Sequence, residues 1–232
     1  MEIIAEIGQN HNGDMKLARE LITSAKRNGA DAVKFQVYDA AALFPREENP
    51  WYNYNLSTEL SQKKLTEIAN FCADLEIEFL ASVFDVERVE WLEELGVRRY
   101  KVASRSIQDK PLIERLLKSQ KPLLVSLGMW KEKTFPTIGA SSRVDFLYCV
   151  SKYPTPLADL KLGQVDFSAY SGFSDHTIGI TSAITALARG AKIIEKHFTL
   201  DKKMYGPDHN CSMTPDELKN LCHYRDEISI LL

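Results

Sequence analysis

The sequence predicts a closed (β/α)₈ barrel, a TIM barrel, that forms a single domain over residues 1–232. Three observations lead to this prediction. Eight short apolar or β-branched runs alternate with helix-like stretches, which is the pattern of a fold built from βα units. Eight units in 232 residues need about 29 residues each, close to the spacing in a typical barrel of about 250 residues. No linker and no low-complexity segment divides the chain.

The predicted strands are short runs in which β-branched and other apolar residues dominate. In chain order they are EIIAEIG (2–8), DAVKFQ (31–36), IEFLAS (77–82), RRYKVAS (98–104), KPLLVSLG (121–128), VDFLYCV (144–150), YSGFSD (170–175) and AKIIEKHF (191–198). An open doubly wound sheet is the alternative topology. It is disfavoured because no G-x-G-x-x-G motif follows a predicted strand.

The stretches between these strands carry apolar residues at helical spacing. The first one begins at the capping residue Asp14 and ends at Gly29. The last one begins with a capping box formed by Thr214 and Glu217. The predicted helical segments are 14–30, 61–75, 85–96, 109–119, 179–190 and 214–232.

Three connections depart from this regular pattern. Residues 37–61 are predicted to form a long, aromatic-rich loop after the second strand. Residues 129–143 are only weakly helical. Residues 153–166 contain Pro154 and Pro156, so we expect no more than a turn of helix there.

Composition excludes several classes of function. A net charge of −3 and a pI near 6.0 provide no basic field for nucleic acid or for an anionic membrane surface. The apolar runs are too short to span a bilayer. Because no signal peptide precedes the first strand and no C-x-x-C pair occurs, we expect a cytoplasmic protein with reduced thiols. The thiols are Cys72, Cys149, Cys211 and Cys222.

Polar residues gather where the predicted strands end, which is the face of a barrel that carries the chemistry. Side chains two positions apart on a strand point to the same face. Ser174 and His176 form one such pair, and Glu195 and His197 form another. A lone buried lysine, serine or histidine usually has a structural role, but so many buried polar groups in one mouth would cost several kcal/mol each without a ligand. These strand-end residues are Glu6, Gln9, Asn10, His11, Lys34, Gln36, Ser82, Lys101, Ser104, Ser126, Ser151, Lys152, Tyr153, Ser174, His176, Glu195 and His197.

Two histidines, His176 and His197, occupy matching ends of adjacent strands, which lie about 4.8 Å apart. Their ring nitrogens can therefore reach one metal ion in an open site. With Glu195 or Asp208 as oxygen donors nearby, Mn²⁺ or Mg²⁺ suits this site as well as zinc does. The lysines and serines at the other strand ends are suited to phosphate and carboxylate groups.

Eight motifs, in order along nearly the whole chain, resemble those of the sialic acid synthase family, the phosphoenolpyruvate-condensing nonulosonate synthases. The motifs are AEIGQNHNGD (5–14), ADAVKFQ (30–36), YKVAS (100–104), VSLGM (125–129), YCVSKYPTP (148–156), GFSDHT (172–177), EKHFT (195–199) and GPDHNCSM (206–213). The resemblance implies a barrel that condenses phosphoenolpyruvate with N-acetylmannosamine or a related N-acetylated hexosamine. The products would be a nonulosonic 2-keto acid and phosphate.

The resemblance also implies roles for individual residues. His176 and His197 match the ligands of a divalent metal, usually Mn²⁺, with Mg²⁺ or Co²⁺ as alternatives. Glu6 matches a carboxylate near the sugar and the attacking water. The positions that match phosphoenolpyruvate contacts are Lys34, Lys101, Ser82, Ser104, Ser126 and Ser174. Those that match contacts of the sugar and the metal-bound water are Gln36, Tyr153, Glu195 and Asp208.

The chain departs from the family pattern in two ways. Ser151 replaces an asparagine that is common in the family, which alters one phosphoenolpyruvate contact. Family members dimerise and usually continue into an antifreeze-like domain that lends an arginine to the partner's sugar site. We therefore expect a homodimer, with a separate antifreeze-like protein as a possible partner. The loop 43–55, with Arg46, is a candidate to replace the missing arginine.

Two alternatives to this function stay open. One is a synthase that acts on another aldose, which the EKHFT and YPTP motifs disfavour. The other is a catalytically altered barrel that binds a sugar or an anion and acts only with a partner subunit.

Overall fold

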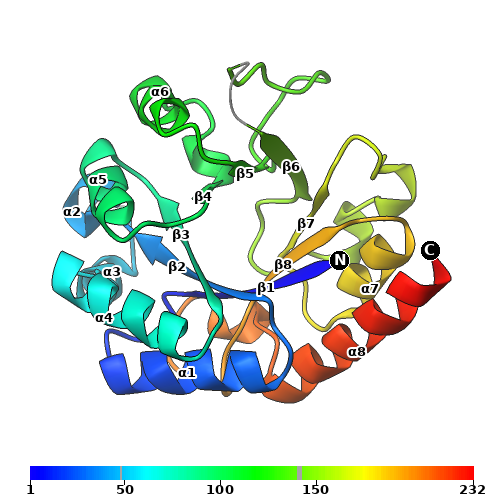
Figure 1. Ribbon diagram of the computed structural model, residues 1–232, viewed down its shortest axis with the longest axis horizontal. Coiled ribbons are helices and arrows are strands. Elements are labelled where there is room, and N and C mark those ends of the chain that lie inside the picture. Colours follow the sequence, from blue (N-terminus) through cyan, green and yellow to red (C-terminus); the bar gives the residue numbers. More distant parts are fainter. Residues whose placement is uncertain (48, 140–142) are drawn as a thin grey trace.

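The computed structural model describes residues 1–47, 49–139 and 143–232 and contains a closed barrel of parallel strands surrounded by helices (Figure 1). The predicted fold is therefore confirmed. The strands pair in chain order, and β8 closes the barrel against β1. Their bounds are β1 (Glu2–Gly8), β2 (Ala32–Val37), β3 (Glu78–Val83), β4 (Tyr100–Val102), β5 (Leu123–Ser126), β6 (Val144–Cys149), β7 (Gly172–Asp175) and β8 (Ile193–His197).

The inside of the barrel changes from apolar to polar along the strands. Six buried apolar side chains form one cluster inside it: Ile4, Ala32, Leu80, Leu124, Leu147 and Ile193. Two positions further along each strand, on the same face, stand Glu6, Lys34, Ser82, Ser126, Cys149 and Glu195. The apolar cluster thus plugs the amino-terminal end of the barrel, and the polar set faces the mouth at the carboxyl-terminal end.

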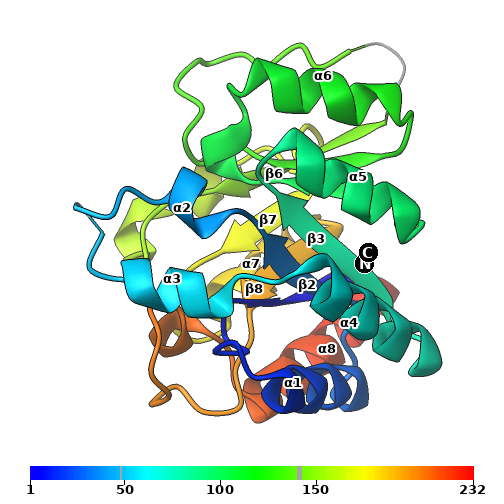
Figure 2. The ribbon, with the colours of Figure 1, turned by 90° about the vertical axis from the view of Figure 1, so that its left-hand side faces the viewer.

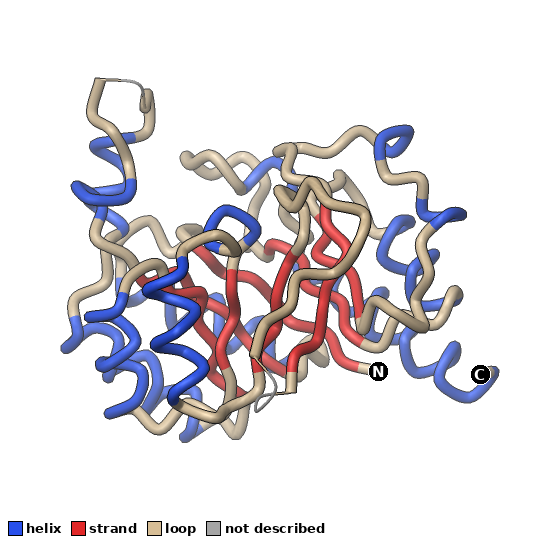
Figure 3. The backbone as a smooth tube through the Cα atoms, turned by 90° about the horizontal axis from the view of Figure 1, so that it is seen from above, coloured by secondary structure: helices blue, strands red, loops and turns tan. Residues whose placement is uncertain are grey.

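Helices pack around the barrel and bury the outward-facing apolar residues of the strands (Figure 3). The predicted caps are confirmed: the Asp14 side chain accepts a hydrogen bond from the Lys16 amide at 2.7 Å, and Thr214 and Glu217 form the capping box. The main helices are α1 (Met15–Arg27), α4 (Gln62–Asp74), α5 (Val86–Glu94), α6 (Lys110–Lys118), α7 (Thr181–Ala188) and α8 (Pro215–Leu231).

The first and last helices close the outer ring. Helices α1 and α8 lie side by side below the barrel (Figures 1 and 2). Arg225 of α8 reaches the segment between α1 and β2, where it donates to the Gly29 carbonyl at 3.2 Å and pairs with Asp31 at 2.7 Å. Together with the pairing of β1 and β8, these contacts join the two ends of the described chain into one barrel.

The prediction of a plain loop over residues 37–61 is wrong. The segment contains two short helices, α2 (Ala40–Leu43) and α3 (Tyr52–Thr58). Asp39 caps α2 through the Ala42 amide at 3.0 Å. Helix α3 buries Tyr54, whose hydroxyl donates to the Gln9 carbonyl at 3.0 Å. The aromatic residues of this segment therefore hold it against the loop that follows β1.

The other two irregular connections agree with expectation. No helix occurs in the described part of residues 129–143. Residues 153–166 contain only two 3₁₀ turns, η2 (Leu157–Asp159) and η3 (Leu162–Gln164). Two more turns, η1 (Ser104–Ser106) and η4 (His209–Cys211), follow β4 and β8 at the mouth of the barrel.

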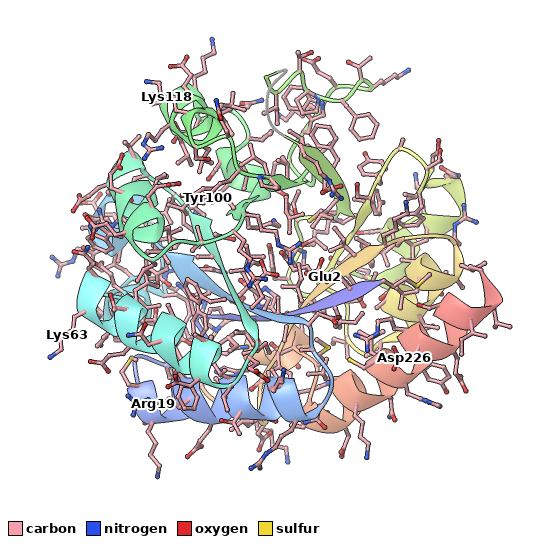
Figure 4. All side chains as sticks on the ribbon, viewed as in Figure 1. Glu2, Arg19, Lys63, Tyr100, Lys118 and Asp226 are labelled. Carbon is pink, nitrogen blue, oxygen red and sulfur yellow. The ribbon has the colours of Figure 1, made fainter. Side chains whose placement is uncertain are left out.

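The periphery of the protein is charged, whereas the cysteines are inside. Figure 4 shows Arg19, Lys63 and Lys118 pointing outward from the helices, while Tyr100 lies between the helices and the barrel. All four cysteines are buried and unpaired, as predicted. Among the described helices, none combines the length and the apolar composition that a membrane crossing requires.

Candidate active site

Two hollows that share lining residues open at the carboxyl-terminal end of the barrel. The inner cavity, of about 60 Å³, is lined by Glu6, Lys34, Gln36, Ser82, Phe84, Lys101, Ala103, Ser104, Ser126, Cys149, Tyr153, Ser174, His176, Glu195 and His197. The outer pocket, of about 620 Å³, is lined by Gln9, Gln36, Leu43, Phe44, Phe84, Ala103, Ser104, Arg105, Met129, Ser151, Tyr153, His197 and Asp208. The inner cavity is mostly polar, and the outer pocket has aromatic and aliphatic walls.

Two buried lysines and two buried carboxylates dominate the inner cavity. Lys34 Nζ lies 2.9 Å from Glu6 and donates to Ser82 Oγ at 2.8 Å. Glu195 lies 3.8 Å from Lys34 and 3.6 Å from Lys101. The lysines hold the carboxylates in place, and each lysine still has N–H donors that can turn toward a ligand.

This network shifts the pKa values of its members in different directions. Burial lowers the pKa of Lys34, but Glu195 and Glu6 outweigh burial, so its pKa lies above the ordinary value. Burial also lowers the pKa of Lys101, and Glu195 does not fully compensate. Burial raises the pKa of Glu195, but Lys101 and Lys34 reverse this and bring it to about 2. Glu195 is therefore an anion at neutral pH. Of the two lysines in the cavity, Lys101 is the one whose positive charge the folded protein stabilises less.

Hydroxyl groups converge on Gly128 beside Lys101. The Gly128 amide lies 3.0 Å from Ser104 Oγ, and Lys101 donates to Ser126 Oγ at 2.8 Å. A Cβ atom at Gly128 would lie only 2.5 Å from Ser151 Oγ and 3.1 Å from Ser104 Oγ, so only glycine leaves room for these groups. The short Ser151 side chain thus reaches this cradle.

The two candidate metal ligands face the same cavity. The ring centroids of His176 and His197 are 5.7 Å apart, and the Tyr153 ring lies 4.1 Å from that of His176. His176 Nδ1 lies 3.0 Å from the Val150 carbonyl and must donate to it, which leaves the Nε2 lone pair free. His197 Nδ1 is buried without a hydrogen-bond partner.

A buried ion pair ties the two histidine-bearing strand ends together from behind. Asp175 and Lys196, which directly precede the histidines, pair in register between β7 and β8. Their charged groups are 3.1 Å apart and fully buried, and Lys196 Nζ also donates to the Thr177 carbonyl at 2.6 Å. Because neighbouring strand residues point to opposite faces, this pair lies outside the barrel and the histidines lie inside it.

This donor set fits a divalent metal. Both imidazoles keep a nitrogen that no hydrogen bond occupies, and for the buried Nδ1 of His197 this is unfavourable unless a ligand uses it. Across residues 1–47, 49–139 and 143–232, no three His, Cys, Asp or Glu side chains are arranged to hold a metal ion. Glu195 is instead held by Ser174 at 2.7 Å and by the lysines. An ion bound here would thus take further ligands from water or substrate, as in an open catalytic site.

Apart from Arg46, the structure brings every residue to which the family resemblance assigns a role to this mouth. Ser151 and Asp208 line the outer pocket, and the others line the inner cavity. Arg46 lines neither hollow and instead lies 5.9 Å from the centre of the Tyr52 ring. Sequence reasoning missed Cys149, which looks like an ordinary core residue. It also missed Arg105, whose only signal is its place directly after Ser104.

Two other strand-end residues have structural roles. Asn10 donates to the Phe198 carbonyl at 2.8 Å and so ties the loop after β1 to the end of β8. His11 is buried outside both hollows. Its Nδ1 accepts from the Gly13 amide at 3.1 Å, and its Nε2 has no partner. Burial, helped by Lys64, lowers the pKa of His11 to about 4.

Acid is therefore expected to destabilise the protein through His11. The unfolded chain binds a proton at this residue near pH 6.5, whereas the folded chain resists it down to about pH 4. The free energy of unfolding should consequently fall as the pH drops through this window, by about 3 kcal/mol at most from this residue. Urea unfolding at several pH values will measure this loss, which the variant His11→Gln should lack.

A matched control is His223→Gln, which changes an exposed histidine on α8. It should keep the full pH dependence of the wild type. Equal pH dependence in His11→Gln and the wild type would show that this histidine does not resist protonation.

Comparison with known proteins places these features in context. The NeuB family model matches residues 21–232. The N,N'-diacetyllegionaminic acid synthase of Legionella pneumophila is 38% identical to the chain, over 99% of the chain and 72% of that protein. The N-acetylneuraminate-9-phosphate synthase of Homo sapiens is 34% identical, over 94% of the chain and 67% of that protein. The chain thus spans about two thirds to three quarters of the length of these relatives.

A solved structure extends the similarity to three dimensions. The N-acetylneuraminic acid synthetase of Leptospira borgpetersenii, in complex with citrate, superposes with a TM-score of 0.88 at 33% identity. The match covers 99% of this chain and 84% of that one. The barrel and the strand ends that form both hollows lie within the matched part.

Proposed function

Because the chain belongs to the NeuB family, we propose that it condenses phosphoenolpyruvate with an N-acetylated hexosamine to give a nonulosonic 2-keto acid and phosphate. The single observation that carries this function is the pairing of two sites in one mouth. A small cavity with two buried lysines and several hydroxyl groups adjoins a wider pocket. His197 lines both hollows, and His176 faces it from the inner cavity. The inner cavity suits a compact anion, and the outer pocket suits a sugar.

We assign phosphoenolpyruvate to the inner cavity. Lys34 and Lys101 supply positive charge there, and the hydroxyl groups around Gly128 supply neutral donors. Charge-assisted hydrogen bonds of this kind are the strongest that a protein offers to phosphate and carboxylate. Glu6 and Glu195 keep the empty cavity close to neutral by pairing with the lysines, which favours a folded protein before the anion binds.

The reaction forms one carbon–carbon bond and breaks one carbon–oxygen bond. The methylene carbon of phosphoenolpyruvate attacks the aldehyde carbon of the open-chain sugar, and the aldehyde oxygen takes up a proton. Water then adds to the carbon that bears the phosphate ester and loses a proton. The bond from that carbon to the ester oxygen breaks, the proton of the new hydroxyl group passes to the departing phosphate, and the 2-keto group forms. No oxidant or reductant is needed.

Residues of the chain have distinct tasks in this sequence. Glu6, held by Lys34 and by Gln36 Nε2 at 3.1 Å, is the carboxylate we assign to accepting the proton of the attacking water. His176 and His197 would hold a divalent cation, which we propose to be Mn²⁺, with Mg²⁺ or Co²⁺ as alternatives. When bound, such an ion supplies Lewis acidity toward the aldehyde oxygen. Tyr153 and Asp208 would orient the sugar in the outer pocket.

The test is the release of free phosphate from phosphoenolpyruvate in the presence of Mn²⁺ and a sugar. We expect release that requires both, with N-acetylmannosamine or its 6-phosphate as the acceptor, because the relatives' names include both unphosphorylated and phosphorylated products. Mass spectrometry should find a 2-keto acid with the mass of the condensation product. Release with a different aldose would favour the alternative synthase, and binding without release would favour the non-catalytic barrel.

We also propose that the chain acts in the cytoplasm, and that it forms a homodimer, as the family resemblance implies. Sedimentation of the purified protein would test the dimer. A separate antifreeze-like protein remains a proposed partner, and its addition should lower the KM for the sugar if it completes the sugar site.

A further inference from the structure

The outer pocket contains one arginine, Arg105, among its lining residues. Arg105 lies in turn η1, directly after Ser104. Its guanidinium group lies 5.5 Å from the centre of the Phe44 ring and donates to the Leu43 carbonyl at 3.3 Å. These contacts with α2 aim the side chain across the rim of the pocket, from the end of β4 toward the segment after β2.

The charge of Arg105 is not neutralised within the part of the chain that the structure describes. No carboxylate there lies within 4.0 Å of it, whereas Arg99 pairs with Glu2 and Glu78. The side chain is exposed at the rim, and the burial of part of it lowers the pKa of Arg105. A guanidinium group that faces a pocket with several free N–H donors and no counter-ion is suited to bind an oxyanion.

The placement of Arg105 separates it from the phosphoenolpyruvate site. Its neighbour Ser104 lines the inner cavity, but Arg105 lines only the outer pocket. Strands β4 and β8 stand on opposite sides of the eight-stranded barrel. Arg105 therefore lies across the outer pocket from His197 and Asp208. A sugar whose aldehyde lies near His197 would point its far end toward Arg105.

We propose that Arg105 binds a phosphate monoester on the acceptor sugar, so that the enzyme prefers a phosphorylated N-acetylhexosamine to the neutral sugar. This inference rests on the proposed function and adds the chemical class of the acceptor to it. Asp208 disfavours an anion on its own side of the pocket, which orients a phosphorylated sugar with its ester at Arg105. The planar guanidinium group can donate two parallel hydrogen bonds to such an ester.

The experiment compares kcat/KM for N-acetylmannosamine and for its 6-phosphate, at saturating phosphoenolpyruvate and Mn²⁺. We expect the wild type to favour the phosphorylated sugar at least about tenfold, and Arg105→Met to lower this ratio by about 10- to 100-fold. Arg105→Lys should restore part of the ratio, because it keeps the charge. The matched control is Arg46→Met, which also changes an arginine that lies over an aromatic ring, and it should leave the ratio unchanged.

The outcomes separate this inference from the function on which it rests. Turnover with a sugar ratio that Arg105→Met does not change would overturn the inference and leave the condensation reaction intact. The inference would also be overturned, with the reaction intact, if Arg105→Met raised the KM for phosphoenolpyruvate and left the KM for the sugar phosphate unchanged. Arg105 would then serve phosphoenolpyruvate and not the sugar. Absence of phosphate release with either sugar would overturn both.

Discussion

Replacing His197 by alanine is expected to abolish Mn²⁺ binding and phosphate release together. His197 and His176 are the two imidazoles of the mouth whose rings face one another, with centroids 5.7 Å apart. No third protein ligand is arranged beside them in the described chain, so one histidine alone would hold the ion weakly. We expect a loss of more than about 100-fold in Mn²⁺ affinity, since even the loss of an outer partner of a metal ligand costs 10- to 100-fold.

Isothermal titration calorimetry with Mn²⁺ measures the affinity, and a phosphate assay measures the turnover. His11→Gln is the matched control, because His11 is also a buried histidine after a neighbouring strand but lies outside both hollows. At neutral pH it should bind Mn²⁺ as the wild type does. Full activity of the wild type after treatment with a chelator would contradict the metal assignment, as would unchanged Mn²⁺ affinity in His197→Ala.

The barrel and its mouth were predictable because two short-range rules are enough to place them. Alternation of strand-like and helix-like segments indicates the βα units, and side-chain parity indicates which residues point inward. Ile4 and Glu6, or Leu124 and Ser126, share the inner face of one strand, and the change from apolar to polar marks the end that carries the site. Convergence in space then follows from closure of the barrel.

The two helices after β2 were missed because local propensity does not specify them. Helix α2 has only four residues, Ala40–Leu43, and α3 begins without a side-chain cap. Contacts with distant segments stabilise them, such as the hydrogen bond from Tyr54 to the Gln9 carbonyl and the bond from the Ala40 amide to Glu59 at 2.8 Å. A sequence pattern does not show such contacts, and the prolines nearby favour a loop.

A related limit of sequence reasoning concerns two arginines: Arg46 was a candidate from sequence, and Arg105 was not. Arg46 looked suitable because it lies in an aromatic-rich segment near a strand end. Arg105 follows β4 through a 3₁₀ turn, and that turn decides the direction of its side chain. Strand parity does not give the direction of a side chain in such a turn. Residues in strands were therefore placed correctly from sequence, whereas this rim residue required the structure.

Replacing Lys101 by methionine is expected to raise the KM for phosphoenolpyruvate and to lower the stability of the protein less than the loss of a structural lysine does. Lys101 Nζ reaches Ser126 Oγ at 2.8 Å and faces the inner cavity. A charge-assisted hydrogen bond contributes about 1.5–3 kcal/mol, so the KM should rise by about 10- to 100-fold. Methionine keeps the length of the side chain and leaves no large void.

The expectation for stability follows from the direction of the pKa shift. Burial lowers the pKa of Lys101 in the folded protein, so the folded state binds this proton less tightly than the unfolded chain does. The folded state therefore bears a cost for this buried charge, and removing the charge offsets part of what is lost when Glu195 keeps only Lys34 as a partner. The free energy of unfolding of Lys101→Met should therefore fall by less than that of a variant in which a buried carboxylate loses its only lysine.

Lys196→Met provides the contrast. Lys196 is also fully buried, but it pairs with Asp175 at 3.1 Å on the outer face of the barrel. Its loss would leave a buried carboxylate without a cation, which typically costs about 3–5 kcal/mol of stability. Urea unfolding should thus show a larger loss of stability in Lys196→Met than in Lys101→Met, and only a lysine kept for ligand binding combines a higher KM with a small loss of stability. A marked loss of stability in Lys101→Met, with an unchanged KM, would mean that Lys101 serves the fold and not the substrate.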